Sequence, residues 1–312
     1  MWETRFGIEI EYSGITRATS SQIAAELFGS RVEHEGGSYD TYSAKDAQGR
    51  KWSFMSDASI LTQCKVGGKV QSADRSYSVE MVSPILTYAD METLQELVRR
   101  LRKAGAIVNS SCGVHVHLDS TGHNPRTVRN FLNIIHSRNS LLYSALSVPD
   151  SRKRFCKELD SYMVEKLNTK RPTSFEEIAT IWYEKFPYDS RGARYHNSRY
   201  ATLNLHALFR TGGHKTLEMR IFNSSLHAGE IRSYVVLALA LNAQALNQKS
   251  ASAKQPKNEE NAKFLMRTWL TRIGLNGNDY KSCRMHLTKN LSGSSAWRLG
   301  SREATPRRKA GE

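Results

Sequence analysis

The segment Phe6-Gly-Ile-Glu-Ile-Glu-Tyr12 alternates between apolar residues and glycine or glutamate. A period of two is typical of a β-strand that buries one face. One face would be apolar, and the other would carry Glu9 and Glu11. Because residues i and i+2 of a strand point to the same side, the two carboxylates should lie about 7 Å apart. Like charges at that spacing repel one another, and a divalent cation held by oxygen ligands would relieve the repulsion. The alternative is a pair of surface glutamates on an edge strand.

Five further segments repeat this alternation and are expected to be strands: residues 51–57, 77–83, 113–119, 201–209 and 215–222. The short loop Thr211-Gly-Gly-His214 separates the last two. A glycine-bearing loop of this length is typical of a hairpin, so these two strands should be antiparallel neighbours.

Helical periodicity fills the intervals between the expected strands. It predicts helices over residues 90–105, 124–146, 174–182, 228–247 and 260–273, with a linker at 249–257. Asp90, Asn124 before Pro125, and Ser174 with Glu177 are the expected N-terminal signals of the first three. The mixture of strands and helices, with at least one hairpin, predicts an α+β fold with an antiparallel sheet rather than a doubly wound parallel one.

The strands place an unusual set of side chains on their second faces. A solvated face would carry mostly Lys, Thr, Ser and Gln. These faces instead carry Glu9, Glu11, Glu80, His115, His117, Asn204, His206, Glu218 and Arg220. Such groups bind metals, donate hydrogen bonds and contact phosphate. A histidine pair one residue apart is a metal pair, a hydrogen-bonded pair or a chance pairing, and Glu218 with Arg220 could form a simple salt bridge.

The chain is strongly basic, with a formal net charge of +15 over 312 residues. Such a surplus favours acidic partners: nucleotides, polyphosphates, nucleic acid or an anionic polymer. Basic residues gather near the C-terminus, at Lys281, Arg284, Lys289, Arg298, Arg302, Arg307, Arg308 and Lys309. We expect a solvated basic tail over residues 291–312, with contact to nucleic acid or another acidic polymer as the alternative.

The remaining features indicate a cytoplasmic protein without a membrane partner. Cys64, Cys112, Cys156 and Cys283 are far apart and form no CxxC pair, which favours a reducing compartment. The N-terminus lacks the apolar core of a secretory signal. The longest apolar stretch, residues 235–246, is too short to span a membrane and reads as a buried helix. We expect a catalytic domain over residues 1–250, a helical extension over 251–290 and the tail.

Six motifs occur in an order that resembles the amidoligase family, whose members are related to glutamate–cysteine ligases and, more distantly, to glutamine synthetase. They are GIEIE (residues 7–11), Asp57-x-Ser59, EMVSP (80–84), CGVHVHLD (112–119), LNLHAL (203–208) and TLEMRIFNSSL (216–226). The resemblance covers about residues 5–248, and it is specific through the combination of motifs rather than through any one of them.

The resemblance implies a glutamine-synthetase-like fold, in which a curved antiparallel sheet binds Mg²⁺ and ATP on its concave face and helices pack on the other. The implied metal ligands are Glu9, Glu11, Glu80 and Glu218. The implied catalytic residues are His115, His117, Arg199 and Arg220. Arg220, Asn204 and His115 would contact the nucleotide or its phosphates. The chain has no GxxxxGK[ST] phosphate loop, so ATP would have to bind on the sheet.

The implied activity is that of an ATP-dependent carboxylate–amine ligase. It would join a small-molecule or peptide carboxylate to an amine through an acyl phosphate, forming an amide bond, with isopeptide and γ-glutamyl bonds among the candidates. Two alternatives remain from the residues themselves. One is a metal-dependent hydrolase with Zn²⁺ or Mn²⁺ on the His115–His117 strand. The other is a basic nucleic-acid- or polyanion-binding protein.

Overall fold

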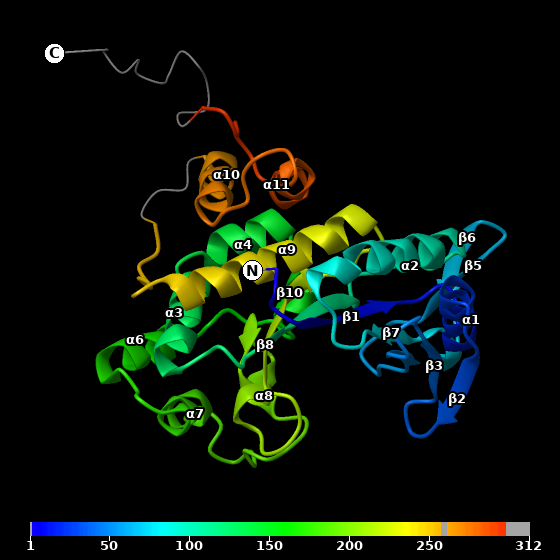
Figure 1. Cartoon of the computed structure of the whole chain (residues 1–312), viewed down its shortest axis with the longest axis horizontal. Helices are drawn as coiled ribbons and strands as arrows, with labels where there is room; N and C mark the ends of the chain where they lie inside the picture. The colour runs from blue at the N-terminus through cyan, green and yellow to red at the C-terminus, as the bar shows by residue number, and fades with distance from the viewer. Residues whose placement is uncertain (1, 257–260, 298–312) are drawn as a thin grey trace.

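The computed structural model describes residues 2–256 and 261–297. Its main feature is an eight-stranded sheet in the order β2-β3-β4-β7-β1-β8-β10-β9, with every neighbouring pair antiparallel (Figure 1). The strands are β1 (Phe6–Tyr12), β2 (Val32–Gly36), β3 (Thr41–Lys45), β4 (Lys51–Met55), β7 (Val79–Val82), β8 (Gly113–Asp119), β9 (Leu203–Asn204) and β10 (Thr216–Asn223). A separate hairpin consists of β5 (Gln63–Val66) and β6 (Lys69–Ser72). The expected α+β class with a large antiparallel sheet is confirmed.

Helices cover one face of the sheet. Figure 1 shows α2 (Met91–Lys103) and α9 (Ala228–Asn247) side by side over it, and α9 packs on β8. Three further helices pack beside them: α1 (Arg17–Phe28) on β3 and β4, α3 (Pro125–His136) on α9, and α4 (Asn139–Leu146) on β10. The other helices are α5 (Asp150–Lys153), α6 (Ser161–Lys170), α7 (Phe175–Tyr183) and α8 (His206–Phe209), with short 3-10 turns at Arg75–Tyr77, Tyr88–Asp90 and Asn197–Arg199.

The apolar face of the central strands forms the core under these helices. In β1, Phe6, Ile8, Ile10 and Tyr12 are each at most 2% exposed. The intervening residues of β1, β7, β8 and β10 lie on the opposite face, as the alternation predicts. Burying one apolar face gives each strand a defined register, because a slip by one residue would move the glutamates into the core.

Two predicted elements differ from the structure. Residues 201–209 do not form one strand: only Leu203–Asn204 joins the sheet, and α8 follows. The Asn204 side chain accepts a hydrogen bond from the His206 backbone N–H (2.8 Å), which turns the chain after the strand. β9 still pairs antiparallel with β10, as the hairpin expectation requires. The predicted helix over 124–146 is divided into α3 and α4, with a break at Ser137 and Arg138. The Ser137 hydroxyl donates to the Ile134 carbonyl oxygen (2.9 Å).

The C-terminal region packs on the outside of the helical layer. α10 (Ala262–Arg272) contacts α4, and α11 (Lys281–Thr288) contacts α4 and α9. In the predicted linker 249–257, residues 249–256 contain no helix or strand, and residue 257 lies outside the described residues. Ala251 is held along α3 by hydrogen bonds with Asn130 and Asn133. The division into three domains stays a prediction.

Part of the C-terminal basic cluster is engaged by the fold. Arg284 donates to the carbonyl oxygens of Leu275 and Gly277, and Lys289 pairs with Glu230. Residues 298–312, most of the predicted tail, lie outside the described residues, so the predicted contact of the tail with an acidic polymer stays a prediction. All four cysteines are free thiols. None of the helices in residues 2–256 and 261–297 has the length and apolar character needed to cross a membrane.

Candidate active site

The strand register brings the predicted site residues together on the face away from α2 and α9. Glu9 lies opposite His115 across the β1–β8 pair, and Glu11 lies opposite Glu80 across the β1–β7 pair. Glu218 on β10 lies opposite His117 on one side and Asn204 on the other. Because neighbouring strands are about 4.8 Å apart, side chains at such paired positions can contact one another.

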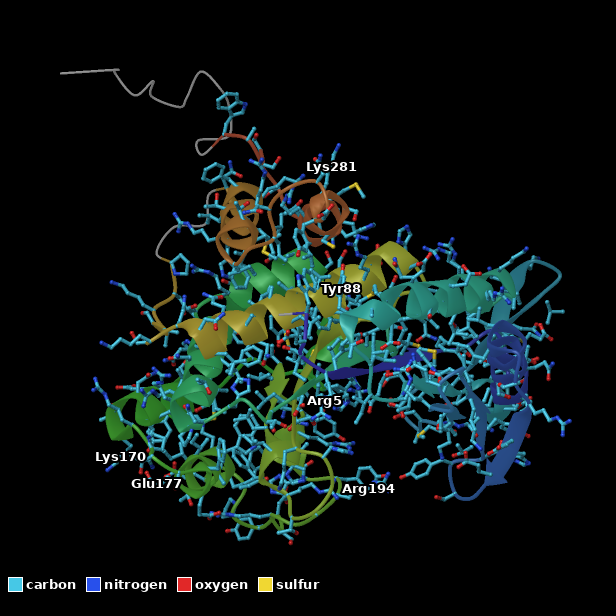
Figure 2. The ribbon with its side chains drawn as sticks, viewed as in Figure 1. Arg5, Tyr88, Lys170, Glu177, Arg194 and Lys281 are labelled. Atoms are coloured by element: carbon cyan, nitrogen blue, oxygen red, sulfur yellow. The ribbon has the colours of Figure 1, made fainter. Side chains whose placement is uncertain are left out.

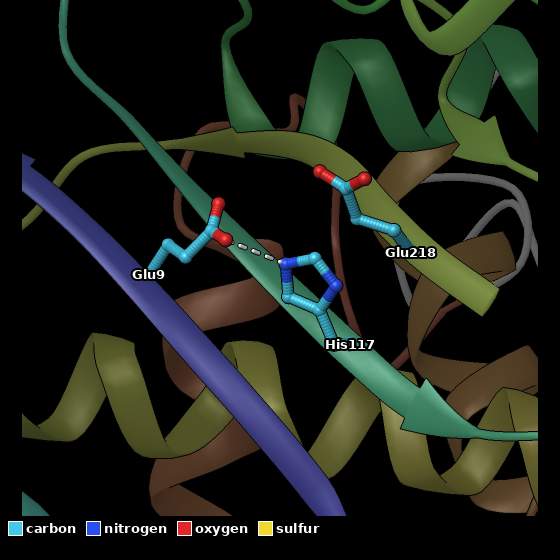
Figure 3. A group of neighbouring side chains, drawn as sticks. All are labelled: Glu9, His117 and Glu218. Atoms are coloured by element: carbon cyan, nitrogen blue, oxygen red, sulfur yellow. Dashed lines mark ion pairs between the residues drawn. The ribbon is translucent and has the colours of Figure 1, made fainter. Parts of the chain in front are cut away.

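Glu9 is the centre of the cluster because it contacts both imidazoles. Its Oε2 is 2.8 Å from His115 Nδ1, and its Oε1 is 3.0 Å from His117 Nε2. Figure 3 shows Glu9 facing His117, with Glu218 beside it. Burial alone would raise the pKa of Glu9, but the charge of His117 and the hydrogen bond of His115 hold it well below its ordinary value. Burial likewise disfavours the imidazolium of His117, yet the carboxylates of Glu9 and Glu218 raise its pKa to about 9. Glu9 and His117 therefore form a buried ion pair.

Glu218 is held in place by two partners. Its Oε1 forms an ion pair with Arg220, and its Oε2 accepts a hydrogen bond from Asn204 Nδ2 (2.7 Å). Burial would raise the pKa of Glu218, but the neighbouring guanidinium of Arg220 lowers it. Arg220 and Asn204 thus orient the Glu218 carboxylate, while their predicted contacts with a nucleotide or phosphate stay predictions.

Glu11, Glu80 and Asp57 form the second part of the cluster. The Gly113 backbone N–H donates to Glu11 Oε2 (2.6 Å), and burial raises the pKa of Glu11. Burial, with the charges of Glu9, Glu11 and Asp57, raises the pKa of Glu80 well above its ordinary value. The Asp57 carboxylate accepts a hydrogen bond from the Ser59 backbone N–H (2.6 Å), so the Asp-x-Ser motif positions this acid. Such a group of carboxylates can ionise fully only beside a cation.

The donor atoms form three overlapping clusters, and within each they lie within 4.8 Å of one another. The clusters are Glu9–His117–Glu218, Glu9–Glu80–His115 and Glu11–Asp57–Glu80. The last contains only oxygen donors, which suits Mg²⁺, whereas the imidazoles of the first two also suit Mn²⁺ or Zn²⁺. His117 Nε2 is buried and, although 3.0 Å from Glu9, makes no hydrogen bond of good geometry. A divalent cation bound by these two carboxylates would replace the positive charge of His117, and the imidazole, once deprotonated, could then ligate the cation.

Two cavities adjoin the cluster. The large cavity, of about 730 Å³, is lined by Glu9 and His117 and has apolar walls that include Ile85, Phe175 and Phe209. The arginine cavity, of about 360 Å³, is lined by Glu11, Asp57 and His115 and by Arg152, Arg199 and Arg220, together with aromatic rings. Predicted residue Arg199 therefore lies beside the cluster, at the side of Glu11 rather than of His117.

Arg152 is a residue of this site that the sequence patterns do not indicate. It belongs to α5, is only 2% exposed, and donates hydrogen bonds to the carbonyl oxygens of Phe222 and Arg220. Its guanidinium packs directly on Gly113, where an added Cβ would lie 2.3 Å from Nη2. The glycine at the start of β8 was the one available signal, since a glycine entering a strand permits a close approach.

A buried cluster of ionisable groups beside two cavities is the arrangement expected of an enzyme active site. The family model described as "Putative amidoligase enzyme" matches residues 2–242, and the chain belongs to this family. Membership places the chain among the amide-bond ligases in general terms and confirms the family indicated by the motifs. A search of curated proteins finds no match.

Proposed function

We propose that this protein is an ATP-dependent carboxylate–amine ligase whose sheet has the glutamine-synthetase-like form. The observation that carries the proposal is the convergence of acidic side chains from three strands and one loop on a single face, next to Arg220 and two imidazoles. Glu9 and Glu11 come from β1, Glu80 from β7, Glu218 from β10, and Asp57 from the segment after β4.

The acidic groups would hold Mg²⁺. Glu11, Asp57 and Glu80 offer an all-oxygen set, and Glu9 and Glu218 complete the row toward the large cavity. When bound, Mg²⁺ would supply positive charge that neutralises the phosphates of ATP during phosphoryl transfer. Burial and neighbouring carboxylates raise the pKa of Glu80, and burial raises that of Glu11. Without a cation, this face of the sheet therefore disfavours further negative charge.

The large cavity suits the nucleoside part of ATP. Phe175, Phe209 and Ile85 would contact the base, while Glu9 and His117 lie at the end of the cavity next to the cluster. Arg5 and Lys215 also line the cavity, and Arg5 pairs with Asp119 (2.6 Å). A cavity with apolar walls and a few polar groups at one end is typical of small-molecule sites.

The reaction would proceed in two transfers. A carboxylate oxygen of the acid attacks the γ-phosphorus, the bond from phosphorus to the bridging oxygen of ADP breaks, and an acyl phosphate forms. The amine nitrogen then attacks the acyl carbon, the carbon–oxygen bond to phosphate breaks, and the nitrogen loses a proton as the amide forms. Arg220, buried beside Glu218, would stabilise charge on the transferring group. Burial lowers the pKa of Arg220, but the neighbouring carboxylates raise it overall, so its charge is permanent.

Trapping the acyl phosphate tests this proposal directly. Pools of carboxylic acids are incubated with Mg²⁺-ATP and hydroxylamine, and hydroxamate and ADP are both measured. We expect both products from the wild type and neither from Glu9→Gln or Glu11→Gln, because each removes a cluster carboxylate. Glu96→Gln, on the exposed face of α2, is the matched control and should retain activity. Undiminished hydroxamate formation in Glu9→Gln would refute the proposal.

A metal-dependent hydrolase is the second candidate, favoured by the mixed cluster Glu9–His117–Glu218. Against it, none of the clusters found among the described residues contains both His115 and His117, so the two imidazoles are not placed as joint ligands. Metal analysis of the purified protein separates the candidates. Stoichiometric zinc together with ATP-independent hydrolysis would favour the hydrolase.

A further inference from the structure

Most of the guanidinium groups that line the arginine cavity have no carboxylate among the described residues as ion-pair partner. Three guanidinium groups line it, and of these only Arg220 forms an ion pair with a carboxylate, that of Glu218. Within the described part of the chain, no carboxylate lies within ion-pair distance of Arg152 or Arg199. Arg152 is buried, and its charge partly offsets the rise that burial causes in the pKa of Glu11, without a hydrogen bond between the two side chains.

Arg199 lines this cavity and has a buried hydrogen-bond donor without a partner among the described residues. Its Nε is buried and has no hydrogen-bond partner, while its Nη2 donates to the Tyr200 hydroxyl (3.0 Å). The guanidinium carbon lies 4.9 Å from the ring centre of Tyr195 and 4.8 Å from that of Tyr200. The Arg199 guanidinium therefore packs near two aromatic rings, and its planar fork suits a carboxylate or phosphate oxygen. A buried donor without a partner is costly unless a ligand satisfies it.

The loop after α7 contributes to the wall of the cavity. This loop, residues 184–196, carries Tyr195 and Arg194, and Figure 2 labels Arg194 on it. The guanidinium carbon of Arg194 lies 5.6 Å from the ring centre of Tyr39. Tyr39 belongs to the turn between β2 and β3 and also lines the cavity. At about 360 Å³ the cavity is at the small end of ligand sites, which are roughly 300–1,000 Å³, so its occupant is a small molecule.

We infer that the arginine cavity binds the acid substrate, and that this acid carries a second anionic group in addition to the carboxylate that is activated. The inference rests on the proposed function. The activated carboxylate lies at the Glu11 and His115 end, next to the cluster. The second anionic group accepts hydrogen bonds from Arg199, and the buried charge of Arg152 stabilises it from the floor of the cavity.

The test compares acids that differ by one charge and little else. The probes are glutarate against its monoamide glutaramate, and succinate against succinamate. Binding is measured by calorimetry with Mg²⁺ and a non-hydrolysable ATP analogue, on the wild type and on Arg199→Gln. The wild type should bind one of the dianions at least 10-fold more tightly than its monoamide. Arg199→Gln should weaken that dianion roughly 10- to 100-fold, the size of one charge-assisted hydrogen bond, and its monoamide less than about 3-fold.

Two further variants separate a binding role from a structural one. Arg199→Lys keeps the charge but loses the planar fork, so its affinity for the dianion should fall between those of the wild type and Arg199→Gln. Arg191→Gln is the matched control: Arg191 lies in the same loop, stacks on Tyr183 and pairs with Glu176, but does not line the cavity. It should bind both probes like the wild type.

Several results would overturn the inference. They are equal affinity of the wild type for dianion and monoamide in both pairs, failure of both dianions to bind, and equal weakening of dianion and monoamide in Arg199→Gln. Hydroxamate formation from monoanionic acids alone would also overturn it, while the proposed ligase activity would stand. Conversely, selective dianion binding without ATP-dependent hydroxamate formation from any acid would refute the ligase but support the dianion site.

Discussion

Replacing Glu80 by glutamine should stabilise the metal-free protein and at the same time remove its response to Mg²⁺. Glu80 lies in two of the three donor clusters, and burial together with the charges of Glu9, Glu11 and Asp57 raises its pKa well above the ordinary value. Glutamine has the shape of the protonated acid and brings no charge into this crowded face. It should therefore fit the metal-free site better than glutamate does.

The expected size follows from the spacing of the cluster. At the 4.8 Å limit that joins its donor atoms, one pair of like charges costs about 3.5 kcal/mol at an effective dielectric constant near 20. Proton binding by Glu80 relieves part of this repulsion, so we expect a net gain of about 2 kcal/mol. At about 2.1 cal/mol/K of unfolding entropy per residue, this gain raises the Tm of the 312-residue chain by roughly 3 °C.

The gain should depend on pH in a defined direction. The pKa of Glu80 is higher in the folded state than its value of 4.5 in the unfolded chain, so above that pH the folded protein binds the extra proton. Stability therefore falls as pH rises through this range, and the advantage of glutamine grows with pH and disappears near pH 4.5.

Thermal unfolding with and without Mg²⁺ at several pH values provides the assay. Free Mg²⁺ at ten times its Kd should stabilise the wild type by about 1.4 kcal/mol and Glu80→Gln by much less. Glu96→Gln, which loses only exposed ion pairs with Arg99 and Arg100, should change stability by less than about 1 kcal/mol and keep the Mg²⁺ response. A lower metal-free Tm in Glu80→Gln, or an undiminished Mg²⁺ response, would show that the electrostatic reasoning is wrong.

Three other substitutions have defined outcomes. Gly113→Ala should lower the free energy of unfolding by about 1 to 3 kcal/mol in urea titrations, because its Cβ would lie 2.3 Å from Arg152 Nη2. Gly7→Ala is the control: its Cβ would meet nothing closer than 3.8 Å, so the substitution should be tolerated. Asn204→Ala should weaken Mg²⁺ binding about 10-fold in calorimetry, because it releases Glu218. Arg50→Met should lower the free energy of unfolding by about 2 kcal/mol at neutral pH, because it removes the hydrogen bonds from Arg50 to Asp90. These bonds hold the pKa of Asp90 below its ordinary 3.8. The loss, measured by unfolding at several pH values, should therefore shrink as acid protonates Asp90.

Sequence patterns predicted the strands that have one apolar and one polar face. β1 and β8 alternate cleanly because one side is core and the other is the site. α1 gave no such signal, since its buried side consists of small residues such as Ser20, Ser21 and Ala24. β2 was missed for a related reason: Val32–Gly36 is largely exposed, so no apolar alternation marks it. Its place at the edge of the sheet depends on pairing with β3.

The residues of the candidate site were likewise only partly predictable from the sequence. The predicted glutamates and histidines converge because strand register is set by the buried face, which the sequence shows. Arg152 could not be predicted, because it lies on a four-residue helix and reaches the site only through tertiary packing against Gly113. The turn at Asn204 was also hidden, since a side-chain hydrogen bond to His206 overrides an alternation of leucines that looks like a strand.

The pairing of β1 with β8 divides the cluster between two cavities. Glu9 and His117 line the large cavity, whereas Glu11 and His115 line the arginine cavity. A step of two residues along each strand thus assigns one acid and one imidazole to each compartment. Under the proposed function, the nucleotide would therefore reach the cluster from the large cavity and the acid from the arginine cavity.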